Sequence, residues 1–141
     1  MSYDRTAMMA ELVDDEGFRA HPYRCTAGKL TIGIGTNIDP DGGGISRQQA
    51  EALAEVKLAE ICREFDRRIP WWRDASEPRK RALLNMGYQL GTAGLMKFKR
   101  MLAAASRGDW DAAADEALDS RWAVQTQPSR VDRVTRFLRD G

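Results

Sequence analysis

The sequence contains few of the residues that build covalent or metal-held scaffolds. It has 2 cysteines and 1 histidine among 141 residues. Two cysteines are too few for the disulfide framework of a small secreted domain, and the spacing of Cys25 and Cys62 fits no zinc-site pattern. We therefore expect two free thiols and no metal site. The chain also lacks a long apolar run, so we predict neither a signal peptide nor an integral membrane segment.

The sequence also lacks an excess of charge of one sign. Its 22 Lys and Arg against 21 Asp and Glu leave a formal net charge of +1, which argues against a nucleic-acid partner. Acidic groups exceed basic ones in residues 1–70, and the reverse holds in residues 71–141. This bias suits an anionic polymer as partner or an ordinary solvated surface. With 43% apolar and 30% charged residues, the chain is expected to be one soluble globular unit.

Local patterns in the first third predict a helix and a small hairpin. Apolar residues at helical spacing support a first helix that ends near Glu16, before Gly17. Alternating apolar and small residues predict a β-hairpin within residues 23–35, although its register is not fixed by the sequence. Residues 37–44 are typical of a loop because turn-forming residues dominate them.

The rest of the chain is predicted to be helical. Ser46 and Gln49 form a capping box that opens a helix to about Arg68. At about 1.5 Å per residue this helix would span about 30 Å, which is long enough to join two lobes. The remaining helix boundaries fall at residues that commonly end or begin helices: Gly91, Gly108, Asp109 and Pro128.

Three blocks of the sequence resemble one family of enzymes. Residues 15–19 (DEGFR), 23–26 (YRCT) and 30–35 (LTIGIG) form a block that resembles the catalytic segment of phage-type lysozymes. These are the endolysin muramidases of glycoside hydrolase family 24. Residues 85–92 (NMGYQLGT) and 120–126 (SRWAVQT) are similar to two cleft segments of the same family, in the same order. The resemblance covers nearly the whole chain.

The resemblance implies a mainly helical α+β fold of the lysozyme-like, two-lobed kind. Residues 1–141 would form a single domain. Its small N-terminal lobe, with the β-hairpin or sheet, would take about 15–45, and the connecting helix about 46–68. The C-terminal helical lobe would take about 69–141 and pack with the first helix.

The resemblance also implies a reaction, the hydrolysis of the β-1,4 bond between N-acetylmuramic acid and N-acetylglucosamine in peptidoglycan, without a cofactor. Glu16 would be the general acid. Such an acid needs a pKa above the ordinary value of about 4.3 to hold its proton near neutral pH. Arg130 falls near the family's position for an arginine that pairs with acids at the cleft. One extra residue separates Thr126 from Arg130 relative to the common family spacing.

Cys25 departs from the aspartate that many members of the family carry. An inverting glycosidase needs a second group that deprotonates water at roughly 6.5 to 9.5 Å from the acid. A thiol with an ordinary pKa near 8.5 does this poorly unless cations lower that pKa, and Arg24 and Lys29 are candidates. Thr31 is expected to hold the water. A covalent glycosyl-cysteine intermediate, or simple packing of Cys25, are the alternatives.

The same segments are implied to hold the substrate. Glycines at 33 and 35 would allow a sharp bend or the close approach of a sugar chain. Core packing is the competing interpretation for Tyr88 and Trp122. The expected substrate-binding residues are Gly33, Gly35, Tyr88, Gln89, Gly91, Thr92, Trp122, Gln125, Thr126 and Arg130.

The implied biology is that of a phage endolysin. Such a protein stays in the cytoplasm of the host bacterium until a separate holin opens the membrane, and then acts on peptidoglycan glycan strands in the periplasm. A monomer is expected. Three other functions fit parts of the sequence: a lytic transglycosylase that leaves 1,6-anhydro ends, a thiol peptidase using Cys25 and His21, and a peptidoglycan-binding module without activity.

Overall fold

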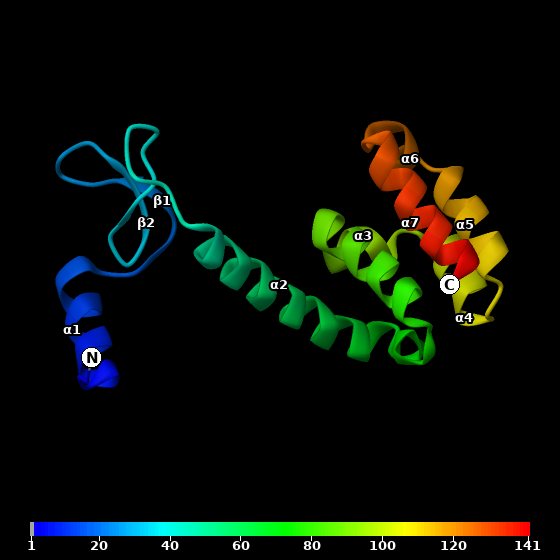
Figure 1. Ribbon diagram of the computed structural model, residues 1–141, viewed down its shortest axis with the longest axis horizontal. Coiled ribbons are helices and arrows are strands. Elements are labelled where there is room, and N and C mark those ends of the chain that lie inside the picture. Colours follow the sequence, from blue (N-terminus) through cyan, green and yellow to red (C-terminus); the bar gives the residue numbers. More distant parts are fainter. Residues whose placement is uncertain (1) are drawn as a thin grey trace. The chain divides into compact units, whose positions relative to one another are not determined.

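A small antiparallel sheet is surrounded in sequence by helices (Figure 1). In this computed structural model, which describes residues 2–141, the predicted class is confirmed as mainly helical α+β. The elements in chain order are α1 (Arg5–Glu16), β1 (Arg19–Arg24), β2 (Leu30–Gly33), β3 (Thr36–Asn37), α2 (Arg47–Arg68), the 3-10 helix η1 (Pro70–Asp74), α3 (Glu77–Met96), α4 (Lys99–Ser106), α5 (Trp110–Leu118), α6 (Arg121–Gln125) and α7 (Pro128–Asp140).

The chain divides into two compact units, Met1–Glu51 and Ala52–Gly141. The boundary falls inside α2, early in the helix that the sequence predicted over 46–68. The predicted lobe ranges, and the packing of the first helix with the C-terminal lobe, stay predictions. Within the described residues, no helix combines the length and apolar character needed to cross a bilayer.

The helix α1 ends where the sequence predicted. Asp4 caps its start, since Asp4 Oδ1 accepts a hydrogen bond of 3.0 Å from the Ala7 N–H. Gly17 follows the last turn with φ 73° and ψ 171°. Residues with a side chain rarely adopt this backbone conformation, so glycine lets the chain leave the helix and enter β1 within two residues.

The sheet has the order β1-β2-β3, with both pairs antiparallel. Thr31, on the central strand β2, pairs with Tyr23 on β1 and with Asn37 on β3. The predicted hairpin is therefore present. The third strand was missed, because a strand of two residues leaves no alternating pattern and Asn37 lies in a segment typical of loops.

The N-terminal unit has almost no apolar core. Among its described residues Thr31 alone is buried, with 4% of its surface exposed. The apolar residues of α1 are exposed within this unit, for example Met9 at 49%. Hydrogen bonds and ion pairs are consequently the main interactions that fix the sheet.

The predicted capping box opens α2. Gln49 Oε1 accepts the Ser46 N–H at 2.8 Å, and Ser46 Oγ accepts the Gln49 N–H at 3.1 Å.

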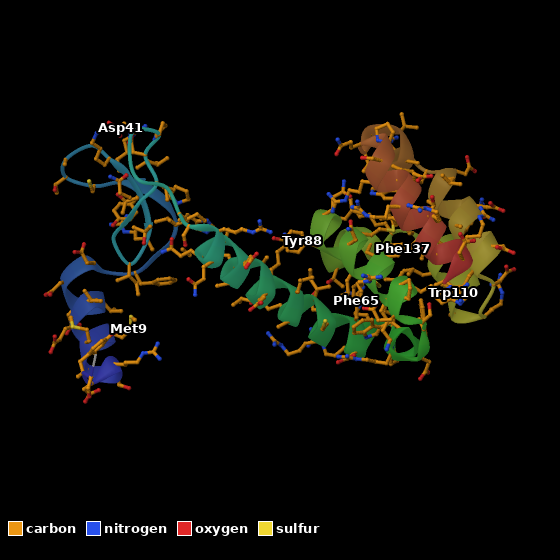
Figure 2. All side chains as sticks on the ribbon, in the orientation of Figure 1. Met9, Asp41, Phe65, Tyr88, Trp110 and Phe137 are labelled. Atoms are coloured by element: carbon orange, nitrogen blue, oxygen red, sulfur yellow. The ribbon has the colours of Figure 1, made fainter. Side chains whose placement is uncertain are left out.

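The C-terminal unit is built around a continuous core. The last turns of α2 carry Phe65 (Figure 2). Phe65 packs directly on Gly87 of α3, because a Cβ at Gly87 would lie 2.9 Å from the Phe65 ring. The largest fully buried side chains are Trp72, Phe65, Leu83, Met86, Leu95, Met101, Leu138 and Val134.

The short helix η1 was not expected from the sequence, which predicted only that the long helix ends near Arg68. It inserts Trp72 into the core, edge-on to Phe65 with ring centroids 5.4 Å apart. The indole Nε1–H donates to Asp66 Oδ1 at 2.8 Å, and Arg73 binds the same carboxylate. This bond satisfies the polar atom of a buried tryptophan.

Gly91 interrupts α3 without ending it. Its φ of 75° and ψ of 159° are non-helical, yet the helical segment resumes and runs to Met96. The predicted stop was therefore a kink. Leu95 belongs to α3 and α4 begins at Lys99, so the segment between the predicted boundaries Gly91 and Gly108 contains the end of one helix and the whole of another.

Candidate active site

The carboxylate of Glu16 lies against the turn between β2 and β3. A Cβ added to Gly35 would be 2.6 Å from Glu16 Oε2 and 2.9 Å from the carboxyl carbon. Only a glycine leaves room for this approach. Glu16 is otherwise exposed, so one side of its carboxylate faces the sheet and the other faces solvent. The close approach of a sugar chain at Gly33 and Gly35 stays a prediction, and at Gly35 the chain's own acid lies close to the backbone.

Gly33 has a different position. Its φ of 68° permits the sharp turn, but a Cβ there would meet nothing within 4 Å. Gly33 and Gly35 therefore share a backbone conformation that favours glycine, while Gly35 alone touches Glu16.

Cys25 lies half-buried at the start of the turn between β1 and β2. Its N–H donates to the Lys29 carbonyl at 2.9 Å, and its carbonyl accepts from the Gly28 N–H at 2.8 Å. The pKa of the Cys25 thiol is lowered, first by the backbone N–H of Lys29, then by that of Ala27 and by the Thr31 hydroxyl. Hydrogen bonds to the charged form favour a thiolate.

The cations that the sequence suggested as neighbours of Cys25 are bound elsewhere. Lys29 Nζ donates to Asp41 Oδ2 at 2.7 Å. Arg24 Nη1 donates to the Gly28 carbonyl at 3.0 Å and lies 3.7 Å from Asp39 Oδ2. The predicted cause of a low pKa was therefore wrong, because backbone amides and a hydroxyl lower the pKa of Cys25.

Thr31 joins the same hydrogen-bond set from β2. Its hydroxyl donates to the Lys29 carbonyl at 2.9 Å, and it also favours the charged form of Cys25. A hydroxyl has one proton. Thr31 therefore bonds the carbonyl when Cys25 is a neutral thiol, and it can turn toward the sulfur when Cys25 is a thiolate.

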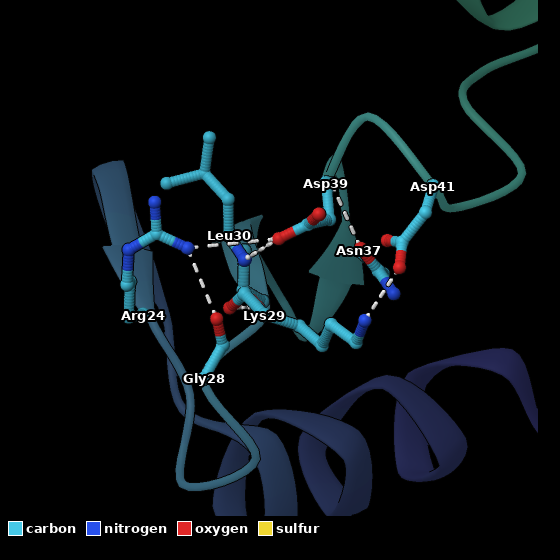
Figure 3. Close-up of polar contacts among 8 residues, drawn as sticks. Arg24, Gly28, Lys29, Leu30, Asn37, Asp39 and Asp41 are labelled. Atoms are coloured by element: carbon cyan, nitrogen blue, oxygen red, sulfur yellow. Dashed lines mark hydrogen bonds and ion pairs between the residues drawn. The ribbon is translucent and has the colours of Figure 1, made fainter.

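Asp39 is a residue that the sequence analysis missed (Figure 3). Its carboxylate accepts the Leu30 N–H at 2.9 Å and has 16% of its side chain exposed. The pKa of Asp39 is lowered, mainly by that N–H. The available signal was the run of turn residues after β3, in which Asn37 Oδ1 accepts the Asp39 N–H at 2.8 Å.

A second group of predicted residues meets in the C-terminal unit around Gln89. Gln89 Oε1 accepts from Trp122 Nε1 at 2.9 Å, and Gln89 Nε2 donates to Thr126 Oγ1 at 3.1 Å. Trp122 and Thr126 are buried, with 5% and 8% of their surfaces exposed, whereas Gln89 is exposed. The two buried residues therefore orient the exposed amide.

The other predicted residues of α3 have separate environments. The Tyr88 ring packs against the core and lies 4.2 Å from Lys57 Nζ. Gly91 forms the kink, and the buried Thr92 hydroxyl next to it has no hydrogen-bond partner among the described residues. Gln125, on α6, is exposed.

Arg130 is held on α7 by Asn85 of α3. Its Nε donates to Asn85 Oδ1 at 2.7 Å and its Nη2 to the Asn85 carbonyl at 3.2 Å. The implied pairing of Arg130 with Glu16 stays a prediction. Of the arginines that recur every three residues after it, Arg136 and Arg139 form ion pairs with aspartates of their own unit.

The arrangement provides an acid and a potential base from one sheet. Glu16 lies at the Gly35 end of β2, and Cys25 with Thr31 lies at the other end. Gly35 lies four positions after Thr31, so their Cα atoms are at most about 14 Å apart. Within residues 2–141, no three His, Cys, Asp or Glu side chains are grouped as a metal site would require.

Comparison with known proteins identifies relatives of this chain. A profile of the family described as Phage lysozyme matches residues 13–135. The pre-baseplate central spike protein Gp5 of Enterobacteria phage T4 is 33% identical over 160 residues, which cover 94% of this chain and 28% of that protein. Two Dictyostelium discoideum proteins, probable T4-type lysozymes 1 and 2, are 27% and 29% identical over 154 residues, with 90% of both chains covered in each case.

Proposed function

Because the chain belongs to the phage lysozyme family, a family of glycoside hydrolases, we propose that it cleaves peptidoglycan as a muramidase. The bond cleaved is the β-1,4 bond between N-acetylmuramic acid and N-acetylglucosamine. The observation that carries the proposal is the seat of the Glu16 carboxylate against Gly35. This contact supports the proposal because it holds a carboxylate beside the sheet that contains Thr31, and Cys25 lies in the turn that leads into the same sheet.

Glu16 is the general acid of this mechanism. Its proton goes to the glycosidic oxygen as the bond to the anomeric carbon breaks, so the leaving sugar departs as an alcohol. The carboxyl group needs a fixed position to do this. The turn at Gly35 supplies that position, since the backbone there blocks one side of the carboxylate.

Cys25 is the general base. Its thiolate takes a proton from a water molecule, whose oxygen attacks the anomeric carbon on the face opposite the leaving group. Thr31 holds this water through its hydroxyl. This course inverts the anomeric configuration. Direct attack by the sulfur would give a covalent glycosyl-cysteine and retention, so the configuration of the product decides between the two roles of Cys25.

Gln89 contacts the N-acetyl groups of the glycan through its side-chain amide. Trp122 and Thr126 contribute to substrate binding by fixing the Gln89 amide through hydrogen bonds. Sugar sites combine a few oriented polar groups with apolar surface, which Tyr88 supplies. The remaining proposed contacts with the glycan strand come from Gly33, Gly91, Thr92, Gln125 and Arg130.

The proposed biological role is lysis of the bacterial host as an endolysin, released to the periplasm by a separate holin. The similarity to the T4 spike protein favours a second role, as the wall-opening part of a virion. Mass spectrometry of purified virions distinguishes them. Detection of this chain in washed particles supports the virion role, and its absence there supports the endolysin.

The test of the reaction is product analysis with anomeric resolution on purified peptidoglycan. We expect new reducing ends of inverted configuration from the parent, and loss of activity in Glu16→Gln. The matched control is Asp14→Asn, an exposed acid on the same helix, which keeps activity. An active Glu16→Gln contradicts the mechanism.

The same digest separates the competing functions. If all new ends are 1,6-anhydro sugars, which are lighter by one water than the reducing ends of hydrolysis, the protein is a lytic transglycosylase. New amino groups without new reducing sugars would assign a peptidase that uses Cys25. Binding to peptidoglycan without any new ends would assign a module without activity.

A further inference from the structure

The turn that carries Cys25 is not held by apolar packing. Thr26, Ala27 and Gly28 are exposed, and Cys25 itself is only half-buried. The position of the sulfur therefore depends on hydrogen bonds to the backbone and on what fixes that backbone.

One peptide group, between Lys29 and Leu30, lies at the centre of these bonds. Its carbonyl oxygen accepts both the Cys25 N–H at 2.9 Å and the Thr31 hydroxyl at 2.9 Å. Because a peptide group is planar, the direction of this carbonyl is fixed once the direction of the Leu30 N–H is fixed.

Asp39 binds the opposite edge of that peptide group (Figure 3). Its Oδ2 accepts the Leu30 N–H at 2.9 Å. The same oxygen lies 3.7 Å from Arg24 Nη1, which donates to the Gly28 carbonyl inside the turn. One carboxylate oxygen thus reaches both strands that lead into the Cys25 turn.

Asp39 is itself held in place. Its N–H donates to Asn37 Oδ1 at 2.8 Å, and its carbonyl accepts the Gly42 N–H at 2.8 Å. The neighbouring Ile38 N–H donates to the Leu30 carbonyl at 2.8 Å. The carboxylate is therefore presented from a rigid segment that follows β3.

We propose that Asp39 is a positioning residue, which fixes the Lys29–Leu30 peptide group and thereby the relative placement of the Cys25 sulfur and the Thr31 hydroxyl. The inference rests on the proposed function, in which these two groups handle the attacking water. Asp39 acts through the backbone and does not touch the substrate. The lowered pKa of Asp39 agrees with a carboxylate that stays ionised throughout the working range.

The test compares three variants in a Cys62→Ala background, where alkylation by iodoacetamide reports Cys25 alone. Asp39→Ala removes the acceptor of the Leu30 N–H. Asp39→Asn keeps a carbonyl oxygen in the same place. Asp41→Ala is the matched control, since it removes a carboxylate of the same loop that binds Lys29 Nζ and not Leu30. Each is measured for alkylation rate against pH, and for kcat and KM on peptidoglycan.

In Asp39→Ala we expect the alkylation profile to move to higher pH and kcat to fall on the order of tenfold to 100-fold. KM stays near that of the parent. Asp39→Asn and Asp41→Ala keep the parent's profile and kcat. An unchanged profile in Asp39→Ala overturns the proposal, and so does an equal loss in Asp41→Ala, which would assign the effect to loop charge.

Two measurements cover the case in which Asp39→Ala does not fold. Asp39→Asn must then remain active, and the Leu30 amide signal in NMR spectra of the parent must shift as the Asp39 carboxyl titrates. A Leu30 amide that is insensitive to that titration overturns the proposal. Alkylation and NMR need no substrate, so a parent that fails to cleave peptidoglycan refutes the proposed function while the positioning of Cys25 is still decided.

Discussion

Gly35 offers a sharp test of the acid because Gly33 provides a control with nearly the same φ angle. Their φ angles are 69° and 68°, so alanine at either position carries a similar strain of roughly 1–2 kcal/mol. A Cβ at Gly35 would lie 2.6 Å from Glu16 Oε2, whereas a Cβ at Gly33 would lie in open space.

We therefore expect Gly35→Ala to lower kcat by on the order of 100-fold. Gly33→Ala keeps most of kcat and changes mainly KM, because Gly33 does not touch Glu16 and acts only in the proposed contact with the glycan. Steady-state kinetics on peptidoglycan together with thermal melting separate the loss of activity from the common loss of stability. Equal activity in the two variants would mean that the seat of Glu16 does not matter to the reaction.

The residue at position 25 sets the pH dependence. A base acts in its deprotonated form, so kcat rises with pH through the pKa of Cys25. Since that pKa is lowered, the rise lies below the ordinary thiol value of about 8.5. In Cys25→Asp it moves toward about 3.9, the ordinary value for aspartate. The check is the pH profile of kcat for both proteins; identical profiles exclude Cys25 as the base.

At the scale of elements, η1 is attached to α2 through Asp66. The carboxylate accepts hydrogen bonds from Arg73 and Trp72, and these lower its pKa to about 2. A lowered pKa in the folded protein contributes stability above the unfolded value of about 3.9, and this is lost as pH falls toward 2. We expect the melting temperature to fall between about pH 4 and pH 2.

Asp66→Asn should melt at a lower temperature at neutral pH and respond less to acid in that window. The exposed Asp74, changed to Asn, is the control and should follow the parent. A parent-like acid response in Asp66→Asn would show that other carboxylates cause the loss.

The elements that sequence reasoning found are those with local signals. Gly17 and Ser46 mark helix ends through contacts within four residues, so the end of α1 and the start of α2 were predictable. The strand β3 and the helix η1 are too short to show periodicity. The turn residues around Asp39 predicted a loop, but they did not predict the hydrogen bond from Leu30 to Asp39. Leu30 lies nine residues away, and no local pattern reports a bond of that range.

For the candidate site, the sequence predicted which residues take part, and the structure added which groups each of them contacts. It named Cys25 and Thr31 but attributed the lowered thiol pKa to cations. It left Trp122 open between sugar contact and core, and the structure buries it beneath Gln89. Backbone amides decide the first difference, and side chains from other helices decide the second. Residue spacing alone does not report either kind of neighbour.

At the scale of the whole molecule, apolar burial is unequal between the two units. Among residues 2–141, the 19 buried hydrophobic side chains all lie from Ile61 to Leu138. The free energy of local opening follows buried apolar contacts. We expect amide hydrogens of β1 and β2 to exchange faster than those at the centres of α3 and α7, measured by hydrogen exchange with mass spectrometry. Equal protection would mean that the sheet draws stability from a source other than its own unit.

The half-exposed place of Cys25 in a turn secured by backbone atoms has a consequence for mutational drift. Cys25 is half-buried and the next three residues of its turn are exposed, so a thiol or a carboxylate can occupy this place without leaving an internal void. Reaction chemistry at this position is thereby separated from fold maintenance. Selection can exchange one proton acceptor for another there in a single substitution, with no compensating change elsewhere in the chain.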